Sequence, residues 1–405
     1  MKRVLILSLN YYPRFIGGAE VAIKEITDRI GSSDIEFHMV TLRFDASLPK
    51  VERVGNVLVH RIGFAKKYPD IADLKRFPLH LNKILFQFLA TCEALHLHKK
   101  YHYDCIWAMM AHSAGVPAAL FKMWNPQVPY LLTLQEGDPI DHIKRTMRFV
   151  YPIFARAFTR ADIVQVISTF LGRWARDMGF VGPLEVVPNA VDTKHFSDEY
   201  TVEQLFALKQ KLGKSSDDIF LITTSRLVAK NAVDDIIRAL KLLPKEIKFL
   251  VLGIGPDETM LRSLARDSGV EDRVKFLGQI SHNEMPVYLK VSDIFIRPSL
   301  SEGMGNSFIE AMAAGVPIIA TQEGGISDFL FDPEKNPECE PTGLAVPVRD
   351  PEAIARQVKR LVEDQALRAY IVANAQKLAR EKYDWNIISR DMKERVFSKL
   401  FTNKN

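Results

Sequence analysis

The stretch from Asp293 to Pro317 reads Asp-Ile-Phe-Ile-Arg-Pro-Ser-Leu-Ser-Glu-Gly-Met-Gly-Asn-Ser-Phe-Ile-Glu-Ala-Met-Ala-Ala-Gly-Val-Pro. Its first residues, Asp293–Ile296, form a short apolar run that predicts a buried strand. Arg297–Gly305 is a glycine-containing loop, and Phe308–Ala314 is a helical pattern that the following Gly-Val-Pro ends. A strand, a loop and a helix in this order predict one unit of a parallel α/β sheet.

Short β-rich runs alternate with longer helical patterns along the whole chain. Ten such runs are predicted as strands: Val4–Leu9, Glu36–Thr41, Asp104–Ala108, Tyr130–Leu134, Ile163–Ile167, Ile219–Thr224, Lys248–Gly253, Val274–Gly278, Asp293–Ile296 and Pro317–Thr321. Several of them are continuously apolar, as strands covered on both faces of a parallel sheet are. The alternation therefore predicts an α/β protein with doubly wound parallel sheets.

The chain is long enough for two domains. Its 405 residues exceed the size at which one hydrophobic core usually stops growing, so we expect two domains of roughly 150–200 residues each. We place the boundary after Val187-Pro-Asn-Ala-Val-Asp192, because a polar helix near Glu199–Leu212 and the loop Gly213–Asp218 follow it. The predicted parts are residues 1–192, residues 193–382 and a C-terminal helix at residues 383–405.

Composition excludes several classes of protein. Hydrophobic residues make up 47% and charged residues 25% of the chain, which are ordinary values for a folded globular protein. The three cysteines, Cys92, Cys105 and Cys339, are far apart and odd in number, which argues against a disulfide framework or structural zinc and favours a reducing cytoplasm. The formal net charge of +5 is mild, and no dense basic block marks a nucleic-acid groove. Anionic ligands and an anionic membrane surface stay open as partners.

Two apolar segments resemble targeting or membrane segments only superficially. The apolar run near the N-terminus is short and is followed by Asn10 and two tyrosines, so we interpret it as a first strand and not as a signal peptide. The stretch Cys105–Phe121 is shorter than a membrane span and contains a histidine, a glycine and a proline. We interpret it as a strand, a loop and a helix.

The loop that ends at Gly305 and the helix after it carry residues suited to an anionic, polyhydroxylated ligand. In parallel sheets, ligands bind at the carboxyl ends of the strands, where helix N-termini present free amides. Gly303 and Gly305 would let the backbone approach a ligand closely, and Glu302 and Glu310 can accept hydrogen bonds from sugar hydroxyls. Two structural alternatives stay open. Ser307-Phe-Ile-Glu310 fits a helix capping box, and Glu302 fits a solvated loop carboxylate.

The segment from Ser299 to Pro317 resembles the retaining glycosyltransferases of the GT-B fold, specifically those of family 4, and the resemblance covers nearly the whole chain. It implies two facing Rossmann-like domains with a cleft between them, the second of which binds a nucleotide sugar. In that family two glutamates separated by seven residues flank the nucleotide sugar. The resemblance therefore places Glu302 near the donor sugar, as a catalytic residue, and Glu310 against the ribose hydroxyls. It also implies donor contacts at the loop residues Gly303, Met304, Gly305 and Asn306.

Two further segments of the second half resemble the same family. Ser225-Arg226-Leu-Val-Ala-Lys230-Asn231 is similar to its phosphate-binding strand end, which implies that Arg226 binds the diphosphate during catalysis and that Lys230 is a second cation. Ungapped alignment puts Asn231 at the usual lysine position. Leu-Gly253-Ile-Gly255-Pro is similar to the family's turn beside the nucleotide base. Without the resemblance, two surface cations and a plain tight turn are the alternative interpretations.

The first half carries weaker matches. The loop Asn10–Glu20 ends the first strand and begins a helix, and Gly17 and Gly18 leave the N-terminus of that helix open to an anion. The family uses this loop against the donor phosphates and the acceptor.

Three polar residues of the first half follow predicted strands. The resemblance places His112 as a catalytic residue close to the sugar, although a lone histidine is more often a packed or solvent-exposed residue. Gln135 stands where the family frequently has a histidine, so Glu136 and Asp138 become candidates on the acceptor side. Solvated loop charges are the alternative for both carboxylates.

The resemblance implies a metal-independent hexosyltransferase that needs no cofactor. It would move a sugar from a UDP-, GDP- or ADP-sugar to a hydroxyl of a glycan or lipid-linked acceptor, with retained configuration. We expect a cytoplasmic protein that binds no nucleic acid and that works in the cytoplasm or at the inner face of a membrane. The segment Leu79–His98 is apolar and lies between Lys66-Lys67 and Lys99-Lys100, so it is either a packed helix or a membrane-contacting patch. Tyr383–Phe397 resembles the terminal helix that crosses back to the first domain in this fold.

Two other functions compete with this one. A two-domain hinged binding protein for sugar nucleotides would have the same layout without catalysis, but the glutamate pair and the missing export signal count against it. A GT-B phosphorylase or epimerase would use the same fold for a different outcome. The pyridoxal-lysine context of such phosphorylases is not found in this sequence.

Overall fold

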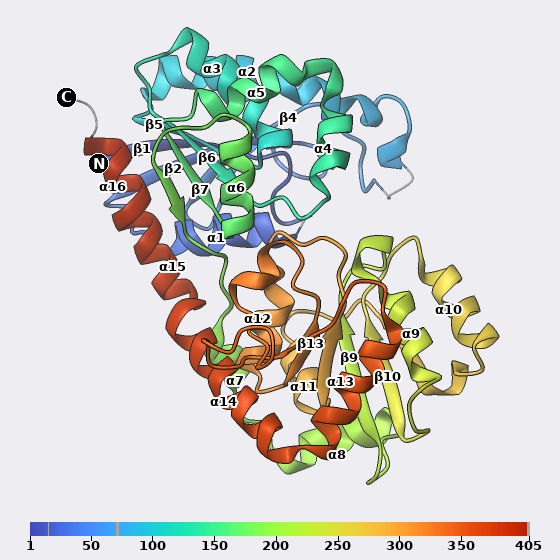
Figure 1. Ribbon diagram of the computed structural model, residues 1–405. Helices are drawn as coiled ribbons and strands as arrows, with labels where there is room; N and C mark the ends of the chain where they lie inside the picture. The colour runs from blue at the N-terminus through green and yellow to red at the C-terminus, as the bar shows by residue number, and fades with distance from the viewer. Residues whose placement is uncertain (15, 70–72, 403–405) are drawn as a thin grey trace. The chain divides into compact units, whose positions relative to one another are not determined.

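The computed structural model describes residues 1–14, 16–69 and 73–402 (Figure 1), and each of the ten β-rich runs predicted from the sequence overlaps a strand. The chain divides into two compact units. The first contains residues 1–189 and the segment from residue 385 onward, and the second contains residues 190–384. The boundaries predicted from the sequence, after residues 192 and 382, lie near these two junctions.

The first unit is built on an eight-stranded sheet with the order β3-β4-β2-β1-β5-β6-β7-β8. Its strands are β1 (Lys2–Leu7), β2 (Ile35–Leu42), β3 (Val51–Val54), β4 (Val57–Ile62), β5 (Cys105–Met109), β6 (Tyr130–Leu134), β7 (Ile163–Val166) and β8 (Leu184–Val186). All neighbouring strands run parallel except β3 and β4, which pair as an antiparallel hairpin. The predicted doubly wound α/β fold is confirmed, and the β3–β4 hairpin adds one antiparallel pair at the edge of the sheet that was not predicted.

The hairpin has a local cause. Gly55 and Asn56 form a two-residue turn between β3 and β4, and Gly55 has a φ of +57°. Two-residue hairpin turns need positive φ angles, which glycine adopts without steric cost.

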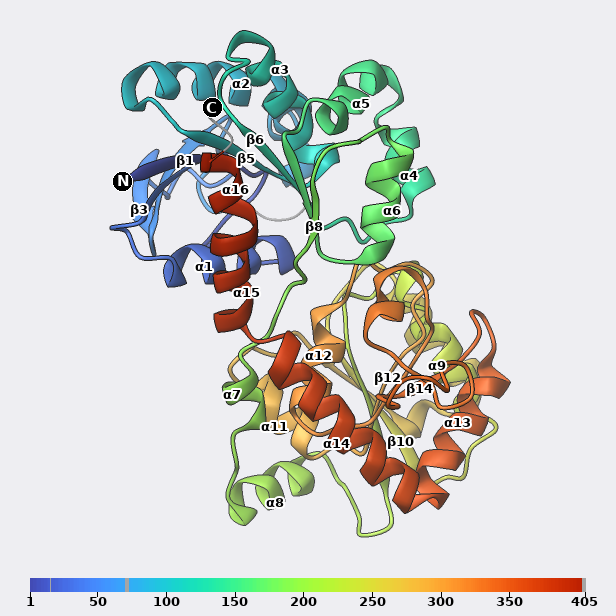
Figure 2. The same ribbon diagram turned by 60° about the vertical axis from the view of Figure 1, so that its left-hand side comes forward.

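Helices cover both faces of this sheet, as Figures 1 and 2 show. They are α1 (Gly18–Arg29), α2 (Asn82–Tyr101), α3 (Val116–Trp124), α4 (Ile140–Thr146), α5 (Tyr151–Thr159), α6 (Thr169–Asp177), α15 (Trp385–Asp391) and α16 (Ser398–Thr402), with the short turns η1 (Asp73–Lys75), η2 (Leu79–Leu81), η3 (Ala111–Gly115) and η4 (Arg148–Val150). On one face α3 packs between α2 and α5, and on the other α1 packs against α15. β1, β5 and β6 lie between these layers, and β5 and β6 are buried along their whole length.

The C-terminal segment was predicted as one helix, and it consists of α15, the π-helical segment η8 (Met392–Phe397) and α16. Its apolar side is buried in the first unit through Ile388, Met392 and Val396. Phe397 packs edge-on against Trp107 of β5, with 5.4 Å between ring centroids. These contacts make the segment part of the first unit's core.

The second unit is built on a fully parallel six-stranded sheet with the order β11-β10-β9-β12-β13-β14. Its strands are β9 (Ile219–Thr224), β10 (Ile247–Leu252), β11 (Val274–Gly278), β12 (Ile294–Arg297), β13 (Ile318–Ala320) and β14 (Leu344–Ala345). The helices are α7 (Thr193–Ser197), α8 (Val202–Lys211), α9 (Val233–Leu240), α10 (Glu258–Asp267), α11 (Met285–Lys290), α12 (Asn306–Ala313), α13 (Pro351–Glu363) and α14 (Gln365–Lys382), with the turns η5 (Ala229–Asn231), η6 (Glu271–Arg273) and η7 (Gly324–Asp328).

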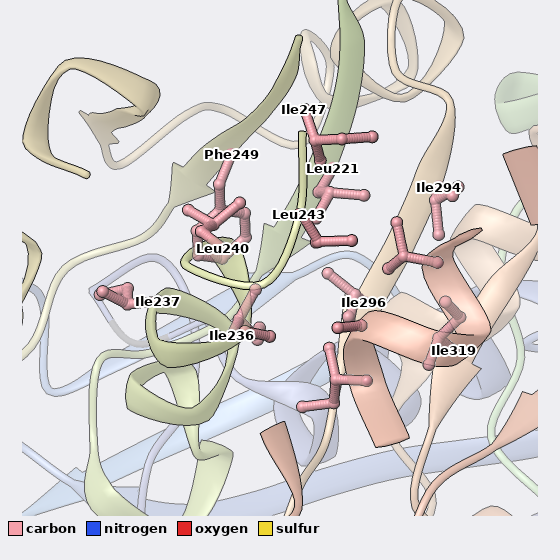
Figure 3. Close-up of a cluster of buried hydrophobic side chains, with 14 of the residues drawn as sticks. Leu221, Ile236, Ile237, Leu240, Leu243, Ile247, Phe249, Ile294, Ile296 and Ile319 are labelled. Carbon is pink, nitrogen blue, oxygen red and sulfur yellow. The ribbon is translucent and has the colours of Figure 1, made fainter. Parts of the chain in front are cut away.

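The core of the second unit lies between this sheet and the helices that flank it (Figure 3). Ile236 and Leu240 of α9 lie beside Leu221 of β9 and Phe249 of β10, and all four side chains are fully buried. Each such side chain contributes about 1.5–3 kcal/mol relative to an exposed one. This core holds the strands in register and so fixes the position of the loops at their carboxyl ends.

In the part of the chain that the structure describes, every helix is too short or too polar to cross a lipid bilayer.

Candidate active site

The loops at the carboxyl ends of β9, β10, β12 and β13 bind one another through their backbones. The Leu300 amide donates to the Lys230 carbonyl at 2.7 Å, and the Leu227 amide donates to the Ile254 carbonyl at 3.0 Å. The Gly325 amide donates to the Glu302 carbonyl at 3.0 Å. The sequence placed Arg226, Lys230, Gly253, Gly255 and Glu302 in the same site, and the structure brings the loops that carry them to one edge of the sheet.

The turn after β10 depends on glycine because it approaches the β9 loop very closely. A Cβ atom at Gly253 would lie 1.9 Å from the Ser225 carbonyl oxygen, and one at Gly255 would lie 2.1 Å from the Leu227 carbonyl oxygen. Real Cβ atoms do not come this close to backbone atoms. The predicted Gly-x-Gly turn is therefore needed for contact between loops, whether or not it also contacts a ligand.

The three polar residues of the β9 loop lie in different environments. Arg226 is exposed and Lys230 is partly exposed, whereas Asn231 is buried. The Asn231 side-chain amide donates to the Arg226 carbonyl at 2.6 Å. Asn231, which stands at the family's usual lysine position, thus stabilises the loop from its buried side. The positive charge at this edge comes from Arg226 and Lys230.

Three hydroxyl groups at the end of β9 are buried without a hydrogen-bond partner among the described residues. They belong to Thr223, Thr224 and Ser225. A buried polar group without a partner costs about 1–3 kcal/mol, so such groups in a native protein point to a ligand or water that completes them. They directly precede Arg226.

The Glu302 carboxylate is held by Arg297, the last residue of β12. The two side chains form an ion pair and are 13% and 7% exposed, respectively. The same guanidinium donates to the Ser307 hydroxyl at 2.7 Å and the Ser299 hydroxyl at 3.1 Å, and it stacks over the Phe308 ring at 4.4 Å. Glu302 is therefore not the solvated loop carboxylate that the sequence left open.

Arg297 was not among the residues predicted for the site. The sequence did contain a signal for it, because Arg297 is a cation at the end of an otherwise apolar strand. A buried cation needs a partner of opposite charge.

The capping-box interpretation of Ser307 and Glu310 is wrong. α12 begins at Asn306 with Gly305 as its N-cap, and Gly305 has a φ of +87°. Ser307 therefore lies inside the first turn, where its hydroxyl binds Arg297. Glu310 lies one turn further on, and its carboxylate is 3.4 Å from the His282 imidazole. Glu310 thus does not cap the helix.

The remaining predicted donor residues lie in the loop before α12. Gly303 and Met304 are buried, and Gly305 and Asn306 are partly exposed. A Cβ atom at Gly305 would lie 2.9 Å from an Arg297 guanidinium nitrogen and 2.7 Å from the Phe308 ring. The packing of the Arg297 side chain thus requires glycine at this position.

In the first unit, the loop after β1 leads into α1 as predicted. Gly17 is the N-cap of α1, and both Gly17 and Gly18 are exposed. The Gly17 amide donates to the Glu20 carboxylate at 2.9 Å, and burial raises the pKa of that carboxyl. Gly18 is exposed in the first turn of α1. A helix N-terminus can bind an anion only where its backbone amides are accessible.

His112 and Glu136 form a pair at the carboxyl ends of β5 and β6. The His112 Nδ1 atom is 3.3 Å from a Glu136 carboxylate oxygen. The same carboxylate accepts hydrogen bonds from the Ala111 amide at 2.6 Å and the Gln135 amide at 2.9 Å. The Glu136 side chain is only 1% exposed and the His112 side chain is 29% exposed. Glu136 thus orients the imidazole, and the alternative of a solvated loop charge is wrong for it.

Gln135 and Asp138 lie on either side of Glu136 in the sequence. The Gln135 side-chain oxygen accepts from the Asn189 side-chain amide at 3.0 Å, which links β6 to the end of the first unit. Asp138 is exposed. Across residues 1–14, 16–69 and 73–402, no group of three or more His, Cys, Asp or Glu side chains is arranged to hold a metal ion.

Comparison with solved structures identifies the class of fold. The chain matches sucrose-phosphate synthase from Thermosynechococcus elongatus with a TM-score of 0.81 and 20% sequence identity, over 99% of this chain and all of that one. Two Rossmann-like units with this topology define the GT-B fold.

Comparison with sequence families identifies the family within that class. The profile described as Glycosyltransferase Family 4 matches residues 16–195, and the profile described as Glycosyl transferases group 1 matches residues 206–378. The chain belongs to this family of glycosyltransferases.

Two curated relatives have similar sequences. One is an uncharacterised glycosyltransferase of Methanocaldococcus jannaschii, 23% identical over 96% of each chain. The other is a GDP-mannose-dependent monoacylated alpha-(1-6)-phosphatidylinositol monomannoside mannosyltransferase of Corynebacterium glutamicum, 30% identical over 57% of this chain and 60% of that protein.

Proposed function

We propose that this chain is a retaining, metal-independent hexosyltransferase. It takes a sugar from a nucleoside-diphosphate sugar and passes it to an acceptor hydroxyl in the assembly of a glycan, polysaccharide or glycolipid. The bond from the anomeric carbon to the diphosphate breaks, and the bond from that carbon to the acceptor oxygen forms on the same face. The acceptor proton leaves with the diphosphate.

The observation that carries this proposal is the edge of the second sheet, where a carboxylate held in an ion pair and two further cations lie on loops that are hydrogen-bonded to one another. Arg226 and Lys230 can neutralise the diphosphate as charge develops on it. Glu302, held by Arg297, can accept hydrogen bonds from the sugar hydroxyls in one defined orientation. We assign Glu310 to the ribose of the donor.

The first unit supplies the acceptor side. His112 is the catalytic candidate there, because it is partly exposed and its ring is oriented by a buried carboxylate. Glu136 accordingly becomes a positioning residue, and exposed Asp138 stays the candidate for contact with acceptor hydroxyls. The exposed start of α1 is assigned to the donor phosphates through the Gly18 amide, since the Gly17 amide already donates to the Glu20 carboxylate.

The acceptor class is proposed from chemistry and from a relative. The Corynebacterium relative is named for a phosphatidylinositol mannoside substrate, which supports a lipid-linked acceptor for this chain. Such an acceptor would place the protein at the inner face of a membrane.

Calorimetric titration with UDP-, GDP- and ADP-sugars, in the presence of EDTA, tests the donor part of the proposal. We expect one base to bind, and we expect Glu310→Gln to weaken that binding while the thermal melting curve is retained. In proton NMR, we expect the new glycosidic bond of the product to have the same anomeric configuration as the donor. No binding by any nucleotide sugar would overturn the proposal, and an inverted product would overturn retention. Isomerised free sugar nucleotide without transfer would identify an epimerase.

A further inference from the structure

Helix α2 is apolar on two opposite sides. One side packs into the first unit through Phe86, Ala90 and Ala94, which are all fully buried. The other side carries Ile84 and Phe88, which are 64% and 54% exposed and lie one turn apart. The sequence left a packed helix and a membrane-contacting patch as alternatives for this segment, and the structure shows a packed side and an apolar solvent side together.

The exposed apolar side chains continue beyond α2. Leu89 adjoins Phe88 and is exposed, and Phe77, just before η2, is 80% exposed. Phe64 is exposed as well, and its backbone is tied to the start of α2. The Phe64 amide donates to the Asn82 side-chain oxygen at 2.8 Å, and the Asn82 side-chain amide donates back to the Phe64 carbonyl at 2.8 Å.

We call this set of residues the α2 face: Phe64, Phe77, Ile84, Phe88 and Leu89. Single exposed apolar side chains are normal on protein surfaces, but a run of them around one helix marks an interaction surface.

The segment that carries the α2 face is positively charged. Residues 61–102 contain eight Lys and Arg residues against three Asp and Glu residues, so this tenth of the chain has a formal charge of +5, equal to that of the whole protein. Lys66 and Arg76 are well exposed, and the carboxylate of Asp73 pairs with both of them. Lys83, Lys99 and Lys100 are exposed along α2 itself.

We propose that the α2 face docks on an anionic lipid bilayer. Exposed apolar side chains on a segment rich in exposed lysine and arginine are suited to the boundary between anionic headgroups and acyl chains. A second copy of this chain is disfavoured as the occupant, because it would bring the same positive charge against this one. This inference rests on the proposed function and extends its acceptor part. Docking would hold the enzyme at the membrane surface that carries a lipid-linked acceptor.

Vesicle flotation of the full-length chain tests the proposal. One set of vesicles contains equal parts of phosphatidylglycerol and phosphatidylcholine, and the other contains phosphatidylcholine alone. We expect flotation with the first set only, decreasing as salt is added. Ile84→Ser with Phe88→Ser is expected to lower the bound fraction about tenfold, given the loss of two apolar side chains.

The chain offers a matched control on α8. Val202 and Phe206 are also one turn apart and are 79% and 63% exposed, but the charges around them are mixed. Val202→Ser with Phe206→Ser is expected to leave flotation unchanged. Equal effects of the two double variants would overturn the proposal, as would equal flotation with both lipid compositions or none with either.

Sedimentation velocity separates docking from self-association. We expect a monomer with and without the α2 substitutions, and a dimer that these substitutions abolish would overturn membrane docking in favour of a second copy. None of these measurements uses donor or acceptor. Failure to float therefore leaves the glycosyltransferase proposal untouched, and failure to bind a nucleotide sugar leaves the docking result untouched.

Discussion

The pair formed by Arg297 and Glu302 gives the sharpest test of the donor site. If Arg297 acts on the reaction by holding the Glu302 carboxylate, then replacing Arg297 should matter only while that carboxylate is present. We therefore predict the outcome of a double-mutant cycle with Arg297→Met, Glu302→Gln and the combination of the two.

The magnitude follows from what the guanidinium contacts. Arg297→Met removes two hydrogen bonds to serine hydroxyls, a stacking contact with Phe308 and the partner of a carboxylate that is 13% exposed. Removing one partner of a buried ion pair costs about 3–5 kcal/mol of stability. Misorientation of the carboxylate against developing charge should lower kcat about 100-fold, which corresponds to about 2.7 kcal/mol. Glu302→Gln should lower kcat by a similar factor.

The assay measures kcat and KM for transfer, with donor affinity from calorimetry and thermal melting as separate readouts. In the Glu302→Gln background, we expect Arg297→Met to lower kcat by less than about threefold, because the group it acts through is already gone. Arg297→Lys should keep part of the activity, since a lysine retains the charge but not the fork of donors.

Arg273 supplies a matched control in the same unit. It is also buried, and its guanidinium donates to the carbonyls of Ile247, Leu240, Leu243 and Pro244 at the other end of the strands. Arg273→Lys should lower the melting temperature with little change in kcat. A full 100-fold loss from Arg297→Met in the Glu302→Gln background would refute the reasoning, because the effects would then be independent. If the methionine variant does not fold, the lysine variant takes its place in the cycle.

Three further predictions concern other parts of the molecule. Glu136→Gln should lower kcat at least tenfold while calorimetric donor affinity is unchanged, because the carboxylate orients His112; a lower melting temperature with normal kcat would leave only a structural role. Burial first, and the nearby His38 second, lower the pKa of His60 to about 4, so the fold holds it neutral while the unfolded chain takes up a proton near pH 6.5. The contribution of neutral His60 to the free energy of unfolding is thus complete above pH 6.5 and is lost as the pH falls toward 4. After discounting for solvent screening, urea unfolding should show a loss of about 1 kcal/mol by pH 5, and His60→Phe should reduce it. Gly255→Ala should weaken donor binding more than tenfold by separating the β9 and β10 loops, whereas Gly18→Ala, whose Cβ would meet open space, should leave the melting temperature nearly unchanged.

Ten strands of the two sheets could be predicted from the sequence because their burial on two faces leaves largely apolar runs, whereas β3, β4, β8 and β14 were not predicted. β3 could not be found in this way, since its residues alternate between partly and fully exposed positions. A different signal was present, because Gly55-Asn56 between two β-rich runs is typical of a hairpin. The Ser-x-x-Glu pattern that suggested a capping box was misleading because the helix begins after Gly305, which has a left-handed conformation, and so starts earlier than the pattern indicated.

The candidate site was predicted as a set of residues but not as a set of contacts. Glu302 and His112 could be singled out by their places after strands. Their partners, Arg297 and Glu136, could not be assigned, because each pairing depends on where neighbouring strand ends lie in space. The contact of Asn231 could not be assigned either. Its side chain is buried, and its amide donates to the Arg226 carbonyl, five residues earlier in the folded loop. Distances between loops are properties of the packed sheet, and a local pattern does not contain them.

The backbone bonds that join the loops after β9, β10, β12 and β13 have a practical consequence for redesign. A change of donor specificity by grafting one loop from a relative would break the bonds that this loop shares with its neighbours, such as that from Leu300 to the Lys230 carbonyl. The four loops are therefore expected to tolerate exchange only as a unit. Specificity for the donor sugar should transfer between relatives when all four loops are exchanged together. Chimaeras with a single exchanged loop should be less stable and should not accept a new donor sugar.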